Sequence, residues 1–267
     1  MTFYDKEIEL LGDTVRKLAA DATGAELDAA MTDVGWHDML TEMPEIAVPL
    51  VFRTLGETGA HAPLINDVVL VAAGRDPGGS VTLPYAGGRW VRWERTDRAG
   101  VTVDAEISLH LADGPEAEGV PLAAGRRAVG WWLVGSARAM LELARTHALD
   151  RTQFGKPVAS FQAVRHRLAE TLVTIEGAES ALQTGNTADD DLGALLGKAA
   201  AGRAALTAAK HCQQVLGGIG FTAEHDLHRH VKRVLVLDGL LGSAKELTRE
   251  AGALVRTLGT APRLAQL

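Results

Sequence analysis

Apolar residues recur at helical spacing through most of residues 123–267, and this pattern limits the C-terminal half of the chain to packed helices. One face of the first helix is formed by Val129, Leu133, Ala137, Met140, Ala144 and Ala148. Further helices are expected at 160–182, 192–216, 224–237 and 243–258. Four or five long helices with short connections predict a helical bundle.

The rest of the chain divides into two further regions. Residues 4–73 have helical spacing, and Pro44 is suited to open one of these helices while Gly59 is suited to end it. Residues 74–122 are rich in glycine and contain short β-like runs at 80–83, 89–93, 100–104 and 106–111. The predicted fold is therefore mainly α, with an N-terminal helical domain (1–73), a shortened middle β-sheet of three to five strands (74–122) and a C-terminal bundle (123–267).

Composition excludes several classes of function. The net charge of −7 argues against a nucleic-acid partner, which needs a basic face. The single cysteine, Cys212, cannot form an internal disulfide or a cysteine metal cluster, and it is expected to be a small buried helix residue. No signal peptide is evident, and no apolar run approaches the ~20 residues of a membrane helix. A cytoplasmic protein with no metal site and no membrane partner is expected.

A tight turn between two predicted helices is the most informative segment. Residues 150–162 read DRTQFGKPVASFQ, with Arg151 at the first edge of the turn. An arginine there can hold a pyrophosphate through two parallel hydrogen bonds, and Phe154 can offer an aromatic face to a flat ring. The alternative is an ordinary interhelical turn with a solvated arginine.

A second cluster, QQVLGGIGF at 213–221, places three glycines within four residues. Glycines allow a ligand to approach the backbone closely, but they also cap ordinary helices. The cluster is neither a dinucleotide-binding fingerprint, because no strand precedes it, nor a phosphate-binding loop, because no Gly-Lys-Ser/Thr follows.

Together the two segments resemble the C-terminal domain of the acyl-CoA dehydrogenase family, which combines Arg-x-x-Phe-Gly, Phe-Gln and a Gln-x-Leu-Gly-Gly-x-Gly-Phe loop at this spacing. The matching residues are Arg151, Phe154, Gly155, Phe161, Gln162, Gln214, Leu216, Gly217, Gly218, Gly220 and Phe221. The order of helices, sheet and bundle also agrees with the family fold. The resemblance is strong over 123–260, fair over 1–73 and poor between them.

The resemblance implies an FAD-dependent α,β-desaturation of an acyl-CoA thioester. In the family, the two turns hold the adenine and pyrophosphate end of the FAD bound by a neighbouring subunit. Arg151 would pair with the pyrophosphate, and Gln214, Gly217 and Gly218 would line the adenosine end. Gln153, Phe154 and Gln162 complete the predicted cofactor-binding set.

This sequence departs from the family at the catalytic base. The usual glutamate position corresponds to Leu241, and the position used by another branch of the family falls near Gly125. A leucine cannot remove a proton. Asp238 and Glu246 flank Leu241, and Asp238, one helical turn away, is the alternative base, whereas Glu142 is interpreted as a surface residue. No catalytic residue is therefore predicted.

The middle region also departs from the family, because it is too short to wrap a flavin and retains only a weak echo of a family signature at 75–80. The resemblance is therefore closest to the non-catalytic chain of actinobacterial α2β2 acyl-CoA dehydrogenases, often acting on steroid-derived CoA esters, whose catalytic glutamate lies on the partner chain. Two alternatives remain: a self-sufficient homo-oligomeric flavin dehydrogenase with an unconventional base, and a non-catalytic scaffold. The three histidines His225, His228 and His230 are expected to be exposed on a helix.

Overall fold

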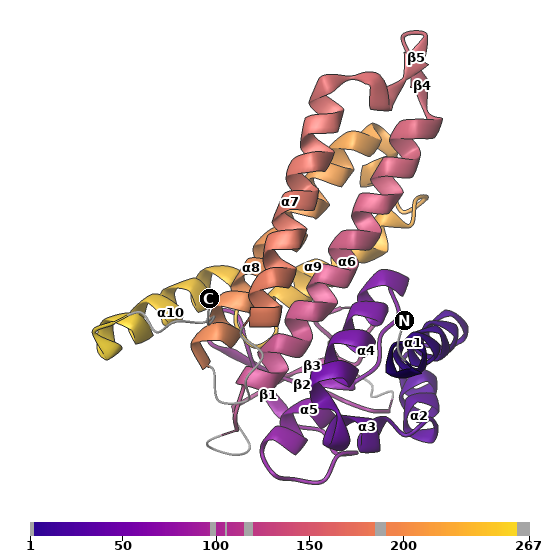
Figure 1. Cartoon of the computed structure of the whole chain (residues 1–267). Helices are drawn as coiled ribbons and strands as arrows, with labels where there is room; N and C mark the ends of the chain where they lie inside the picture. Colours follow the sequence, from indigo (N-terminus) through magenta and orange to yellow (C-terminus); the bar gives the residue numbers. More distant parts are fainter. Residues whose placement is uncertain (1–2, 97–99, 105, 115–119, 185–190, 261–267) are drawn as a thin grey trace.

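The computed structural model describes residues 3–96, 100–104, 106–114, 120–184 and 191–260. Five helices come first, a three-stranded sheet follows, and five further helices complete the described chain. Figure 1 shows the long helices of the C-terminal half standing side by side, with the N-terminal helices packed at their lower end. The order predicted from the sequence, helices then sheet then bundle, is confirmed.

The N-terminal helices are α1 (Phe3–Asp21), α2 (Ala25–Asp33), α3 (Trp36–Glu42), α4 (Pro44–Thr58) and α5 (Ile65–Ala72). Pro44 occupies the first turn of α4, and Gly59 ends that helix in a left-handed conformation, as predicted. The helix α3 was not predicted, because its seven residues are too few to show a period. Its N-cap is Gly35, at a φ of 86°.

The sheet is an antiparallel meander of β1 (Thr82–Tyr85), β2 (Arg89–Trp93) and β3 (Leu109–Ala112). Leu83 pairs with Val91, and Trp93 pairs with Leu109. All four side chains are buried, so one face of the sheet directs apolar side chains into the core. The predicted strand at 100–104 is wrong in the described residues. Only Thr102 forms an isolated bridge, to His110, and Gly100 has a φ of 147°.

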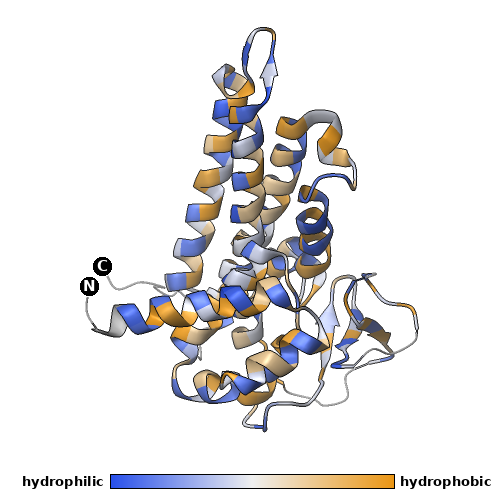
Figure 2. Cartoon of the chain, turned by 90° about the vertical axis from the view of Figure 1, so that its right-hand side faces the viewer, coloured by the Kyte–Doolittle hydropathy of each residue, from blue (hydrophilic) through white to orange (hydrophobic). Residues whose placement is uncertain are grey.

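The bundle consists of α6 (Ala123–Asp150), α7 (Gln162–Thr184), α8 (Asp191–Leu216), α9 (Leu227–Gly239) and α10 (Ala244–Leu258). A hairpin of β4 (Thr152–Gln153) and β5 (Lys156–Pro157), with the short 3-10 helix η1 (Val158–Ser160), joins α6 to α7. A second 3-10 helix, η2 (Gly217–Phe221), leads from α8 toward α9. Orange and blue alternate along the bundle helices in Figure 2, as amphipathic packing requires.

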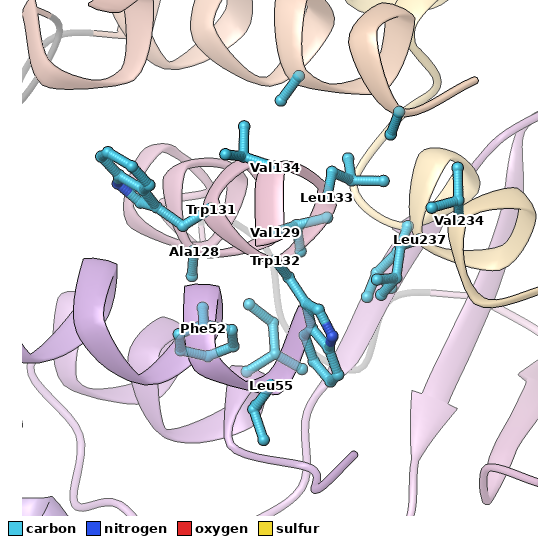
Figure 3. Close-up of a cluster of buried hydrophobic side chains, with 14 of the residues drawn as sticks. Phe52, Leu55, Ala128, Val129, Trp131, Trp132, Leu133, Val134, Val234 and Leu237 are labelled. Carbon is cyan, nitrogen blue, oxygen red and sulfur yellow. The ribbon is translucent and has the colours of Figure 1, made fainter. Parts of the chain in front are cut away.

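The helix α6 is the centre of the core, because it contacts the N-terminal helices on one side and the bundle on the other. In Figure 3 Trp132 points toward Phe52 and Leu55 of α4, while Trp131 leaves α6 on another side. Trp132 also stacks on Trp93 of β2, with ring centroids 5.7 Å apart. One continuous apolar core therefore joins the three regions of the chain.

Close approach of α4 to α6 depends on two glycines. A Cβ added to Gly56 would lie 2.3 Å from the carbonyl oxygen of Trp132, and one added to Gly135 would lie 2.1 Å from that of Arg53. The two backbones thus meet where any larger residue would overlap the opposite helix.

A buried ionic network anchors the segment at 75–80. Asp67 is fully buried and accepts hydrogen bonds from the Trp36 indole, the Gly78 amide and the Arg95 guanidinium. Arg95 also donates to both carboxylate oxygens of Asp28, at 2.7 and 2.8 Å. The residues around Gly78 therefore have a structural role in fixing α5 against the segment that follows β2. Among the described residues, no helix is both long and apolar enough to span a membrane.

Candidate functional site

The predicted phosphate-binding arginine stands at the base of an exposed hairpin. Arg151 directly follows α6, and its carbonyl accepts a hydrogen bond of 2.8 Å from the Val158 amide, which closes the hairpin. At the tip, Phe154 and Gly155 have φ values of 54° and 77°. Positive φ at both central residues is typical of a two-residue hairpin turn and is unfavourable for phenylalanine. Arg151, Gln153 and Phe154 are all exposed, Phe154 at 91%.

Contacts with the Phe161 ring hold the side chains of the hairpin in place. The Phe154 ring meets the Phe161 ring edge-on at 6.2 Å between centroids, and the Lys156 ammonium lies 4.5 Å from the Phe161 ring. Gln162 is the first residue of α7 and is exposed. The hairpin therefore presents an arginine, a lysine and an aromatic ring to whatever approaches this end of the molecule.

The glycine loop lies at the end of α8. Gly217 has a φ of 67°, and no atom lies within 4 Å of a Cβ added to Gly217 or Gly218. The backbone there is open, as close approach of a ligand requires. Gly220 differs, because its added Cβ would lie 2.7 Å from the carbonyl oxygen of Gln213, so this glycine serves packing. Gln214 is exposed.

The chain direction brings both turns to the same end of the bundle. The hairpin joins α6 to α7, and η2 follows α8, which runs back toward that end (Figure 1). Within the described ranges no hydrogen bond or ion pair connects the hairpin with η2. The two turns are thus separate parts of one exposed end, available to a ligand or a partner chain.

Both family positions for the catalytic base are apolar, and the structure brings them into contact. Leu241 is fully buried, and its Cδ1 lies 2.9 Å from a Cβ added to Gly125. Leu241 has a φ of 62°, and its amide donates to the carbonyl oxygen of Pro84 at 2.8 Å. The space at Gly125 is also limited by Val69. No carboxylate occupies either position, and the leucine fills the space between them.

A buried lysine holds the turn that carries Leu241. Lys198 of α8 is fully buried and donates to the carbonyl oxygens of Asp238 and Gly242, at 3.0 and 2.6 Å. Burial lowers the pKa of Lys198 to about 7. The Asp238 carbonyl is in the last turn of α9, where a cation is favoured, and the Gly242 carbonyl lies just beyond the helix.

The alternative carboxylates have structural partners. Asp238 accepts a hydrogen bond from the Ala244 amide at 3.1 Å and caps the start of α10. Glu246 completes a capping box with Ser243 and accepts from the Gly87 amide at 2.8 Å. These hydrogen bonds lower the pKa of Glu246 to about 2. Glu142 is exposed and pairs with Arg145 at 2.8 Å. None of the three is placed as a substitute base.

The three histidines near the start of α9 differ from expectation. His230 is only 7% exposed and packs against Gly59, so its predicted exposure is wrong. Burial lowers its pKa to about 4. His225 and His228 are half-buried rather than exposed, and His225 precedes α9, so the prediction is wrong for these two as well. In the part of the chain that the structure describes, no group of three or more histidine, cysteine, aspartate or glutamate side chains is arranged to hold a metal ion. Cys212 is buried, as expected, and burial raises its pKa to about 12.

Comparison with known protein families identifies the bundle. The model of the acyl-CoA dehydrogenase C-terminal domain matches residues 114–252, more than half of the chain. The chain belongs to the acyl-CoA dehydrogenase family. Members of this family are flavoproteins that bind FAD. The resemblance drawn from the two turns is therefore confirmed.

The sequence of this chain can be aligned with part of several curated proteins. Acyl-CoA dehydrogenase FadE34 of Mycobacterium tuberculosis is 41% identical over 129 residues, which are 46% of this chain and 18% of that protein. In seven such relatives, the segment that matches this chain is less than half of the relative's own length.

Two solved structures share the fold over nearly the whole chain. A chain of a steroid acyl-CoA dehydrogenase, Tcur3481–Tcur3483, matches with a TM-score of 0.74 at 18% identity. The superposition covers 96% of this chain and 99% of the other. A chain of the ChsE4–ChsE5 complex of Mycobacterium tuberculosis matches with a TM-score of 0.66 at 19% identity. The superposition covers 98% of this chain and 99% of the other. The predicted acyl-CoA dehydrogenase fold is confirmed.

Proposed function

We propose that this chain is the FAD-sharing, non-catalytic subunit of a heteromeric acyl-CoA dehydrogenase that α,β-desaturates a CoA thioester. The catalytic glutamate would lie on the partner chain, in an α2β2 assembly. The observation that carries the proposal is that Leu241 and Gly125 occupy the two family base positions and lie in contact. Neither position therefore holds a carboxylate or has room for one. This acyl-CoA dehydrogenase chain alone is then expected to be inactive.

The closed base site supports this division of labour. Removal of the α-proton needs a basic group within hydrogen-bond reach of the substrate. Leu241 offers none, and the apolar side chains around it exclude water. Asp238 does not replace it, because its carboxylate caps α10. A self-sufficient homo-oligomer with an unconventional base is therefore not favoured.

The exposed end of the bundle fits the adenine and pyrophosphate end of FAD. The Arg151 guanidinium has no ion-pair partner among the described residues and can donate two parallel hydrogen bonds to a phosphate. Gly217 and Gly218 leave their backbone open, and Gln153, Gln162 and Gln214 offer amide groups. When bound, FAD supplies the acceptor for the hydride of the β-carbon. The residues of this chain would orient the cofactor and shield it from water.

Related complexes support the partner and the substrate class. One structural neighbour is a complex of two different chains, ChsE4 and ChsE5, and another is described as a steroid dehydrogenase. The exposed Phe154 ring, at 91%, is an aromatic side chain that a partner chain would cover. Because one of these neighbours is a steroid dehydrogenase, we propose a steroid-derived CoA thioester as the substrate.

The test is an absorbance spectrum of the chain purified alone and after co-expression with a catalytic acyl-CoA dehydrogenase chain from the same organism. We expect a colourless chain and a yellow complex that an acyl-CoA bleaches. In the complex, Arg151→Ala is expected to reduce FAD retention at least about tenfold. Arg256→Ala, at an exposed arginine in the last turn of α10, is the matched control and should retain FAD. A chain that is yellow alone and bleached by substrate would contradict the proposal.

A further inference from the structure

A mainly apolar cavity of about 360 Å³ lies where the end of α3, the first turns of α4, the helix α5 and the start of α6 meet. This volume is in the range of small-molecule binding sites. Its wall includes Val48 of α4, Val71 of α5, and Ala124 and Trp131 of α6. In Figure 3, Trp131 leaves α6 on a different side from Trp132, which points into the core. The face of α6 that carries Trp131 therefore borders a space that the core does not fill.

This cavity involves neither the family base positions nor the FAD end of the bundle. On α6, Gly125 faces Leu241 and Val69, and none of these three residues lines the cavity. The helices α5 and α6 thus meet at Gly125 and Val69, and the cavity lies outside that contact. Arg151 and the glycine loop contribute nothing to its wall. A ligand held here would therefore be additional to those that the proposed function requires.

Water is a poor occupant of this space. A volume of 360 Å³ corresponds to about twelve molecules of liquid water. Apart from Thr41, Glu45 and Arg127, the lining side chains are apolar. The Thr41 hydroxyl already donates to the His37 carbonyl at 2.9 Å, and Arg127 is buried and already has a partner. Replacement of this water by a hydrocarbon surface is thus favourable.

A proline inside α4 supplies the wall with a hydrogen-bond acceptor. Pro49 has no backbone N–H, so it cannot donate to the Glu45 carbonyl four residues earlier. Both residues line the cavity. Thr41 lies nearby at the end of α3, and because its one proton is donated to His37, its oxygen can only accept. The start of α4 therefore offers acceptors that match the hydroxyl group of a ligand.

We infer that this cavity binds an uncharged, mainly hydrocarbon molecule that carries a hydroxyl group. The hydroxyl lies toward Glu45 and Pro49, and the hydrocarbon part lies against α5 and Trp131. An anionic ligand is not expected, because the exposed Glu45 carboxylate would repel it. The inference goes beyond the proposed function and does not depend on it, since the residues involved are different.

The probes are 2-naphthol, which carries a hydroxyl donor on a hydrocarbon ring system, and 2-methoxynaphthalene, which lacks the donor. Equilibrium dialysis measures the binding of each probe to the full chain. We expect 2-naphthol to bind about fivefold more tightly, because it forms one more hydrogen bond. Pro49→Ala restores a backbone donor for the Glu45 carbonyl and should remove this preference while the apolar wall is kept.

A filled cavity provides the second test. Ala72 is exposed and lines the cavity at the end of α5, so Ala72→Trp should weaken 2-naphthol binding at least about tenfold. Ala169→Trp, at an exposed position of α7, is the matched control and should bind the probe as the unsubstituted chain does. Circular dichroism verifies that the variants fold.

Four outcomes would overturn the inference: no binding of 2-naphthol, equal affinity for the two probes, an unchanged affinity in Ala72→Trp, or loss of binding when a catalytic acyl-CoA dehydrogenase chain is added. The last would show that the surface of a protein covers the cavity. The colour of the complex bears only on the proposed function, so the two can fail separately.

Discussion

Restoring a glutamate at position 241 tests whether the missing base is all that this chain lacks. Leu241 is fully buried against Gly125, so Leu241→Glu would place a carboxylate in an apolar space. We expect the free energy of unfolding to fall by more than about 2 kcal/mol. We also expect no desaturase activity from the variant alone, because the proposed function places the rest of the flavin site on the partner chain. Urea denaturation and bleaching of flavin by acyl-CoA measure the two effects.

Leu241→Met is the matched control, because a change that conserves volume costs less than about 1.5 kcal/mol. Robust desaturase activity from Leu241→Glu without a partner would refute the proposal of an incomplete site. At this scale the sequence identified Leu241 and Gly125 separately, by counting from the two turns. It could not show that they touch, because that contact depends on how α6 packs beside the end of α9. The burial of His230 was missed for the same reason.

At the scale of an element, the hairpin between α6 and α7 places a phenylalanine where backbone geometry favours another residue. Phe154 has a φ of 54°, which asparagine adopts more readily. We expect Phe154→Asn to leave the free energy of unfolding within about 1 kcal/mol of the original, since relief of strain offsets the lost contact with Phe161. Binding of the partner chain should nevertheless weaken at least about tenfold.

Thermal unfolding of the chain and gel filtration of the complex measure these two quantities. A variant that assembles normally would show that the exposed ring is not part of the interface. Elements were predicted well where their signal was long or chemically specific: the turn at Arg151 and the helices of the bundle were found. The short α3 was missed, and the strand predicted at 100–104 was wrong. A few residues carry little periodicity, so contacts with neighbouring elements decide their conformation.

At the scale of the whole molecule, stability depends on how closely α4 approaches α6, because this contact joins the N-terminal helices to the bundle. A Cβ added to Gly135 would lie 2.1 Å from the carbonyl oxygen of Arg53, so the two helices would have to separate. Separation would loosen the packing of Phe52 against Trp132, whose centroids are 5.7 Å apart. We expect Gly135→Ala to lower the free energy of unfolding by more than about 2 kcal/mol.

The bundle provides its own control for this prediction. Gly177 lies in the middle of α7, is exposed, and would have no atom within 4 Å of an added Cβ. Alanine is a better helix former than glycine, so Gly177→Ala should raise the free energy of unfolding by up to about 1 kcal/mol. The same substitution is thus expected to act in opposite directions in two helices. Chemical denaturation of both variants decides the matter: equal effects would mean that close packing of α4 on α6 does not join the two regions.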